Sequence, residues 1–153
     1  MGKVISISNH KGGVGKTTSA INIGAGLNNL KKKVLLIDLD PQANLSQSLG
    51  ITTPDKTIYG ALRGEYKLEP IEILKGLDLI PSTLDLSGAE VELSGEPGRE
   101  YILKELIDEV KGSYDFVIID SPPSLGLLTI NSFTASDEIL IPLQAQYLAL
   151  QGL

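Results

Sequence analysis

The sequence predicts an α/β fold in which helices cover both faces of a doubly wound, mainly parallel sheet. Five short apolar runs recur along the chain, each followed by turn residues and then by a segment with helical periodicity. Two of the runs, Val34–Ile37 and Phe116–Ile119, are apolar at every position, which is typical of central parallel strands buried on both sides. The length of 153 residues suits a single domain, so we expect one over residues 1–153. The predicted strands are Val4–Ser8, Val34–Ile37, Leu77–Ile80, Phe116–Ile119 and Ile139–Leu143.

The segment after the first strand has the apolar spacing of an amphipathic helix. Ala20, Ile23, Gly24 and Leu27 follow one another at positions i, i+3, i+4 and i+7, which predicts a helix from residue 16 to about residue 30. A glycine on this packing stripe costs about 1 kcal/mol of helix propensity. Gly24 therefore either permits a close approach of the helix to the sheet or is merely tolerated. Two further helices are predicted, over Glu100–Lys111 and near Thr57–Arg63.

The composition excludes several classes of function. The chain has no cysteine, which rules out disulfides, thiolate metal sites, iron–sulfur clusters and cysteine nucleophiles. Its net charge of −6 argues against binding nucleic acid or acidic membranes through bulk charge. The basic run Lys31–Lys33 is expected in the last turn of the first helix, with a nucleic-acid patch as the alternative. Neither a membrane span nor a signal-peptide core is visible, so we expect a cytoplasmic location.

The glycine-rich segment Lys11–Thr18 carries the strongest chemical signal. It lies between the first predicted strand and the first predicted helix, where consecutive glycines allow backbone N–H groups to surround an anion. Its spacing is that of a P-loop, in which Lys16 would reach the β- and γ-phosphates and the Thr17 hydroxyl would bind Mg²⁺. The alternative is a simple glycine-rich turn before a helix. The strand, loop and helix order favours the phosphate site.

Three carboxylates follow two of the predicted strands. Asp38 and Asp40 stand at the end of the second strand, and Asp120 at the end of the fourth. Ligands of open α/β sheets bind at the carboxyl ends of the strands, so all three could face the phosphates. Taken singly, Asp40 with Pro41 could start a turn and Asp120 could cap a helix. Together they indicate a nucleotide-hydrolysis site.

The P-loop departs from the ordinary pattern because His10 stands where the first glycine is usual, and Lys11 follows it. This form resembles the deviant Walker A motif of the superfamily that contains ParA/Soj, MinD and the nitrogenase iron protein. The sequences DLDPQ at residues 38–42 and DSPPS at residues 120–124 resemble the corresponding segments of ParA/Soj partition ATPases. The nitrogenase-like relatives need cysteines that are absent here, and MinD-type relatives lack the Asp-Pro-Gln sequence found at residues 40–42.

The resemblance implies a P-loop NTPase three-layer sandwich that binds ATP or ADP with Mg²⁺ and hydrolyses ATP slowly. It implies that Lys11 reaches the nucleotide of a second subunit in an ATP-bound homodimer. It also implies that Asp40 positions the attacking water, that Asp120 holds Mg²⁺ through a bound water, and that Asp38 supports the metal or Lys16. The implied catalytic residues are Lys11, Lys16 and Asp40, the metal-site residues Thr17, Asp38 and Asp120, and the phosphate-binding residues Lys11, Gly12, Gly13, Val14, Gly15, Lys16, Thr17 and Thr18.

The resemblance further implies a role in chromosome or plasmid partitioning. A ParB-like adaptor would stimulate hydrolysis, and ATP-bound dimers would bind nucleoid DNA without sequence preference. Family members run beyond the equivalent of Leu153, so we expect the chain to lack a carboxyl-terminal part that carries much of the adenine pocket and the basic DNA-binding surface. The net charge of −6 agrees with little DNA binding by these residues. The alternatives are a non-hydrolysing nucleotide-binding module and a MinD-like membrane ATPase, for which no terminal amphipathic helix is visible.

Overall fold

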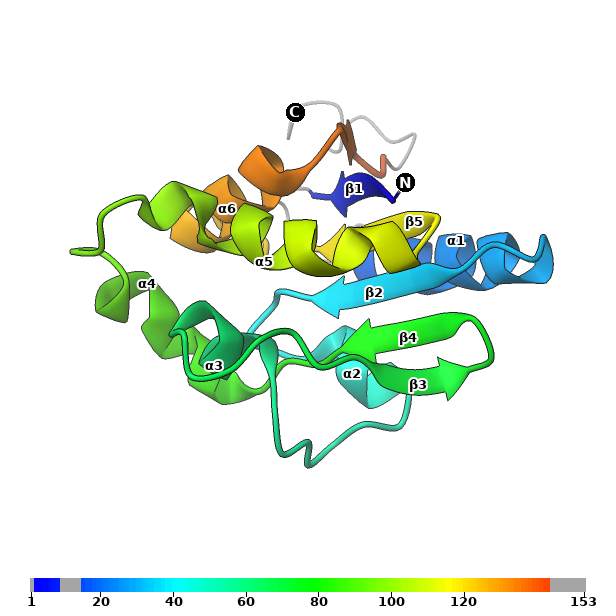
Figure 1. Ribbon diagram of the computed structural model, residues 1–153, viewed down its shortest axis with the longest axis horizontal. Helices are drawn as coiled ribbons and strands as arrows, with labels where there is room; N and C mark the ends of the chain where they lie inside the picture. The colour runs from blue at the N-terminus through cyan, green and yellow to red at the C-terminus, as the bar shows by residue number, and fades with distance from the viewer. Residues whose placement is uncertain (1, 9–14, 144–153) are drawn as a thin grey trace.

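The computed structural model describes residues 2–8 and 15–143, which form a sheet between two layers of helices (Figure 1). The sheet has six strands in the order β3-β4-β2-β5-β1-β6. Neighbouring strands run parallel except for the antiparallel pair β3 and β4. The strands are β1 (Lys3–Ile7), β2 (Val34–Asp38), β3 (Ile71–Leu74), β4 (Leu77–Ile80), β5 (Phe116–Asp120) and β6 (Glu138–Leu140).

The helices are divided between the two faces of the sheet. The first face carries α1 (Lys16–Asn29) and α2 (Asn44–Ser48), and the second carries α3 (Ile58–Leu62), α5 (Ile102–Val110) and α6 (Leu127–Ala135). Shorter turns connect them: η1 (Leu84–Gly88), α4 (Ala89–Glu92), η2 (Arg99–Tyr101) and η3 (Lys111–Ser113). Within the part of the chain that the structure describes, no helix is long and apolar enough to cross a membrane.

Two hydrophobic cores explain why the central strands are apolar throughout. Leu35 and Ile37 of β2 join the core on the second face, where they meet residues of α3, α5 and α6. Val34 and Leu36 join the core on the first face, together with Ala20 of α1. Because successive side chains of a strand point to opposite faces, a strand between two cores needs an apolar residue at every position.

The structure confirms the predicted α/β class and the central position of β2 and β5. β4 has the predicted bounds, and β1 lies one residue earlier than expected. The fifth predicted strand was wrong in extent, because β6 ends at Leu140 and leaves Ile141–Leu143 outside it. β6 pairs with only three residues of β1, and Pro142 has no N–H group with which to continue a ladder.

The predicted helices agree with the structure in position and differ at their ends. α3 begins after Thr57, whose hydroxyl accepts a hydrogen bond from the Tyr59 N–H at 3.2 Å. The helix expected over Glu100–Lys111 is shorter, because 3₁₀ turns occupy both of its ends. The elements that were not predicted are β3, α2, η1, α4 and α6.

Lys31–Lys33 do not lie in the last turn of α1 as predicted. The helix ends at Asn29, and Lys31 takes a left-handed conformation with φ of 64°. The Lys31 N–H donates to the Asn28 carbonyl at 2.9 Å and the Lys32 N–H to the Leu27 carbonyl at 3.1 Å. This is the hydrogen-bond pattern of a Schellman motif, which closes the helix before the lysines.

Gly24 permits a close approach of α1 to the sheet, because a Cβ atom there would lie 2.9 Å from Cδ2 of Leu36. Gly26, in the same helix, has open space around its Cα atom. Both alanine variants would gain up to about 1 kcal/mol of helix propensity. We expect Gly26→Ala to raise the free energy of unfolding by about 0.5–1 kcal/mol. The free energy of unfolding of Gly24→Ala should be roughly 1–2 kcal/mol lower than that of Gly26→Ala, because the added methyl group overpacks the contact with Leu36. Urea unfolding measures both, and equal stabilities would contradict the close approach.

Candidate functional site

The three carboxylates singled out from the sequence lie at one edge of the sheet. Asp38 and Asp120 are the last residues of β2 and β5, and they are partners in the register of these strands. Asp40 lies two residues beyond β2, and the N–H of the intervening Leu39 donates to the Asp120 carbonyl at 2.9 Å. All three side chains are buried. The parallel pairing of β2 and β5 therefore brings carboxylates that are far apart in the sequence to one place.

The amino terminus of α1 meets the same edge. Gly15 precedes the helix with φ of 86°, a conformation that favours glycine. The Thr17 hydroxyl donates to Oδ2 of Asp120 at 2.7 Å, and Lys16 is only 7% exposed. Thr18, in contrast, is exposed. The first turn of a helix presents N–H groups without intrahelical partners and the positive end of the helix dipole, which together favour an anion.

The predicted phosphate loop is only partly within the described residues. Lys11, Gly12, Gly13 and Val14, as well as His10, lie outside the described residues. The structure therefore brings together Gly15, Lys16 and Thr17 with the three carboxylates, and the roles of the residues before Gly15 stay predictions.

Asp120 has the most unusual electrostatic environment of the three carboxylates. Its pKa is raised to about 7, chiefly by burial and also by the charges of Asp38 and Asp40, against the lowering effect of the Thr17 hydrogen bond and the Lys16 charge. Its Oδ1 atom is the one buried side-chain oxygen or nitrogen without a hydrogen-bond partner among residues 2–8 and 15–143. An unpartnered carboxylate oxygen beside a threonine hydroxyl is a donor set that suits Mg²⁺. These residues therefore fit a magnesium ion and the phosphates that would accompany it.

Asp38 is held differently, because both of its oxygens already accept hydrogen bonds. Oδ1 accepts from the Asp40 N–H at 3.2 Å, and Oδ2 accepts from the N–H and hydroxyl of Ser46 at 2.9 and 2.7 Å. Burial raises the pKa of Asp38, and the Ser46 hydrogen bonds oppose this shift. The carboxylate is thus anchored to the loop that carries Asp40.

Asp40 combines a turn with a position next to the other carboxylates. Its Oδ1 accepts from the Gln42 N–H at 3.0 Å, so Asp40 and Pro41 do begin a turn, one of the two structural alternatives considered from the sequence. The other alternative, that Asp120 caps a helix, is wrong. Glu90 caps α6, accepting from the N–H groups of Leu127 and Leu128 at 2.5 and 3.1 Å.

Sequence reasoning missed two buried serines at this edge, Ser46 and Ser82. Ser46 lies on α2 and Ser82 follows β4, and both are hydrogen-bonded within the carboxylate site. No motif marks either serine, because their contacts with Asp38 and Asp40 arise only when the segments fold together.

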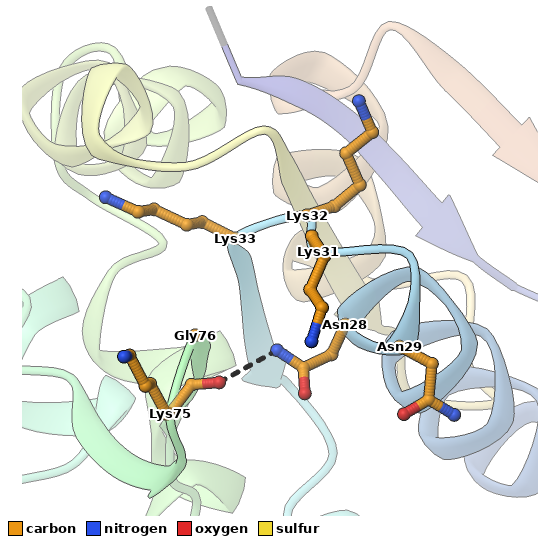
Figure 2. A pocket seen from close by; sticks show the side chains of 7 residues that line it. All are labelled: Asn28, Asn29, Lys31, Lys32, Lys33, Lys75 and Gly76. Carbon is orange, nitrogen blue, oxygen red and sulfur yellow. Dashed lines mark hydrogen bonds between the residues drawn. The ribbon is translucent and has the colours of Figure 1, made fainter.

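Several lysines gather at the other end of β2. A hollow of about 420 Å³ there is lined by Asn28, Asn29, Lys31, Lys32, Lys33, Lys75 and Gly76. Figure 2 shows that the ammonium groups of Lys32 and Lys33 point away from each other and away from Asn28. Lys31 extends toward Asn28 instead. Because Lys32 and Lys33 diverge and all the lining lysines are exposed, we interpret the hollow as a solvated, basic surface and not as a phosphate site.

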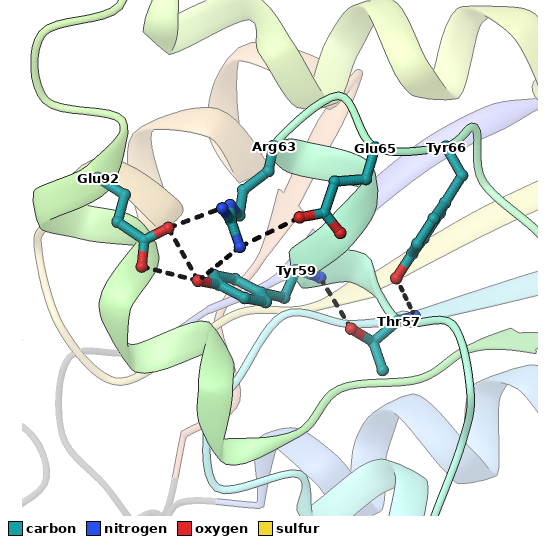
Figure 3. Close-up of polar contacts among 6 residues, drawn as sticks. All are labelled: Thr57, Tyr59, Arg63, Glu65, Tyr66 and Glu92. Atoms are coloured by element: carbon teal, nitrogen blue, oxygen red, sulfur yellow. Dashed lines mark hydrogen bonds and ion pairs between the residues drawn. The ribbon is translucent and has the colours of Figure 1, made fainter.

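A surface polar cluster over α3 is structural in character (Figure 3). Arg63 forms ion pairs with Glu65 at 3.1 Å and Glu92 at 3.2 Å, and the Tyr59 hydroxyl donates to Glu92 at 2.7 Å. These groups are substantially exposed, so the ion pairs contribute little stability. The cluster ties α3 to α4.

Comparison with known proteins gives the family. The family described as "AAA domain" matches residues 2–153. The chain belongs to this family. Its relatives include the sporulation initiation inhibitor protein Soj of Bacillus subtilis, 50% identical over 160 residues, with 100% of this chain and 62% of that protein covered. The chromosome-partitioning ATPase Soj of Treponema pallidum is 50% identical over 156 residues, with coverages of 100% and 61%.

Among solved structures, the chain is similar to the Mycobacterium smegmatis protein named cobyrinic acid a,c-diamide synthase. It superimposes with a TM-score of 0.96 at 41% identity, with 100% of this chain and 64% of that chain covered. That protein has been solved with ADP and magnesium and with an ATP analogue and magnesium. The resemblance to ParA/Soj proteins inferred from the motifs is confirmed, and the chain spans about 60% of the length of these relatives.

Proposed function

We propose that residues 1–153 form the nucleotide-binding domain of a Soj/ParA-type partition ATPase, which binds ATP with Mg²⁺ and hydrolyses ATP slowly. The observation that carries the proposal is the hydrogen bond from the Thr17 hydroxyl, at the start of α1, to Oδ2 of Asp120, whose other oxygen is buried without a partner. We favour a role in partitioning over the synthase reaction in the name of the M. smegmatis protein. The chain is 50% identical to the Soj relatives and 41% identical to that protein.

Phosphoryl transfer to water requires positioning and charge neutralisation more than covalent chemistry. Lys16 and the amides at the start of α1 would bind the β- and γ-phosphates. Thr17 and Asp120 would hold Mg²⁺, which supplies further neutralisation of phosphate charge when it is bound. Asp40 would orient the attacking water, since its carboxylate lies at the same edge and has one oxygen beyond the Gln42 hydrogen bond.

The wider properties of the proposed ATPase follow from the family. Lys11 would reach the nucleotide of a second copy in an ATP-bound homodimer in the cytoplasm. A lysine is a weaker clamp than a bidentate arginine finger, which contributes about 10³ to 10⁵ in rate, so intrinsic turnover should be slow. A ParB-like adaptor would accelerate it, and the net charge of −6 argues against association of these residues with nucleoid DNA.

The Asp40→Ala variant tests the reaction. We expect its Kd for mant-ATP with Mg²⁺ to stay within about 3-fold of wild type and its phosphate release to fall about 100-fold, because the water loses its orienting carboxylate. Asp55→Ala, which removes an exposed carboxylate from the segment between α2 and α3, is the matched control and should change neither quantity.

The outcomes separate the proposal from the binding-module alternative. If the wild-type chain binds mant-ATP but releases no phosphate, these residues form a non-hydrolysing nucleotide-binding module, which the incomplete coverage of the relatives would explain. Equal phosphate release from Asp40→Ala and wild type would remove Asp40 from the reaction.

A further inference from the structure

Two buried serines complete a closed ring of hydrogen bonds around the backbone of Asp40. The Asp40 N–H donates to Oδ1 of Asp38 at 3.2 Å, and the Ser46 hydroxyl donates to Oδ2 of the same carboxylate at 2.7 Å. The Ser82 N–H donates to the Ser46 hydroxyl oxygen at 3.0 Å, and the Ser82 hydroxyl donates to the Asp40 carbonyl at 2.8 Å. The ring therefore begins at the N–H of Asp40 and returns to the carbonyl of the same residue.

Each member of the ring comes from a different part of the fold. Asp38 ends β2, Ser46 lies on α2, and Ser82 follows β4. Ser46 and Asp38 are completely buried, and Ser82 is 2% exposed. Removal of one partner from such a buried network leaves its neighbours with one hydrogen bond fewer, and water cannot easily replace the lost group. The ring is thus a rigid connection between three elements and Asp40.

We propose that Ser46 and Ser82 are positioning residues that hold the backbone of Asp40, and through it the Asp40 carboxylate, in the place from which it orients water. This inference rests on the role of Asp40 in the proposed function. Small displacements of a reacting or orienting group are costly, and a misplacement of about 1 Å can reduce a rate about 100-fold. The two serines need no contact with the nucleotide to have such an effect.

The Ser46→Ala variant tests the ring, with Ser48→Ala as the matched control on the exposed side of the same short helix. We expect Ser46→Ala to reduce kcat for phosphate release about 10-fold and to leave the KM for ATP within about 2-fold, because ground-state binding does not use the ring. Ser46→Thr keeps the hydroxyl and should recover most of kcat. Ser82→Ala should reduce kcat about 3-fold to 10-fold, a smaller loss because the Asp40 carbonyl retains the Ala43 N–H.

Amide hydrogen exchange of the nucleotide-free chain gives a readout that does not depend on hydrolysis. Ser46→Ala should speed exchange of the Asp40 amide about 10-fold and leave the Leu36 amide, in the centre of β2, unchanged. Unaltered exchange at Asp40 would overturn the ring, and faster exchange with unaltered kcat would overturn its positioning role. A wild-type chain without phosphate release would refute the proposed hydrolysis, and the exchange result would then decide the hydrogen-bonded ring alone.

Discussion

The Lys16→Ala variant is expected to lose nucleotide binding, with the Kd for mant-ATP and Mg²⁺ raised at least about 100-fold. Lys16 is almost completely buried at the start of α1, and its charge lowers the pKa of the neighbouring Asp120. The ammonium group therefore lies at the edge where the phosphates would bind. Hydrogen bonds to charged groups contribute about 1.5–3 kcal/mol each, so the loss of one or two accounts for the expected change.

Lys75→Ala is the control for Lys16→Ala. Lys75 is an exposed lysine of the hollow at the opposite end of β2, and its removal should leave the Kd unchanged. Thermal unfolding of both variants shows whether the chain stays folded. If Lys16→Ala and wild type give the same titration curve, or if Lys75→Ala weakens binding instead, the nucleotide does not bind at the start of α1.

Asp120 should make the stability of the nucleotide-free, magnesium-free chain fall as the pH rises from about 4 to about 7. Its pKa of about 7 in the fold lies above its ordinary value of 3.8, so the folded chain binds a proton in this range that the unfolded chain has released. At about 1.4 kcal/mol per pKa unit, we expect a loss of roughly 2–4 kcal/mol in the free energy of unfolding. Below about pH 4 the contribution is fully present.

The Asp120→Asn variant removes this titration and should flatten the pH dependence of stability. Urea unfolding at pH 5, 6, 7 and 8, without Mg²⁺, measures the slope for each protein. Asp55→Asn is the control, because an exposed aspartate should leave the wild-type slope unchanged. Parallel curves for Asp120→Asn and wild type would show that Asp120 does not carry the raised pKa.

The sequence was sufficient to predict the elements whose patterns reflect burial alone. β2 and β5 lie between two cores, so their unbroken apolar runs identify them as central strands. The apolar spacing of α1 identifies this helix equally clearly, because one face of the helix packs on the sheet. β3 has only four residues in an alternating pattern. α6 buries the polar residues Thr129, Asn131 and Ser132 and exposes Ile130 and Phe133, so it shows no apolar stripe of helical period.

The candidate site divides in the same way. The carboxylates could be predicted because parallel strands end at a common edge, which places Asp38 beside Asp120 as soon as β2 and β5 pair. Ser46 and Ser82 could not be predicted, since their hydrogen bonds depend on how α2 and the end of β4 pack against Asp38 and Asp40. Tertiary contacts between separate segments leave no local pattern in the sequence.

A crystal structure of the chain with Mg²⁺ and a non-hydrolysable ATP analogue would show directly where the nucleotide binds. We expect a triphosphate at the start of α1, with Lys16 on its phosphates and the metal next to Thr17 and Asp120. Two results would contradict this site: a nucleotide bound in the lysine-lined hollow between Asn28 and Lys75, or no nucleotide at the carboxylate edge in crystals soaked at a saturating concentration of the analogue.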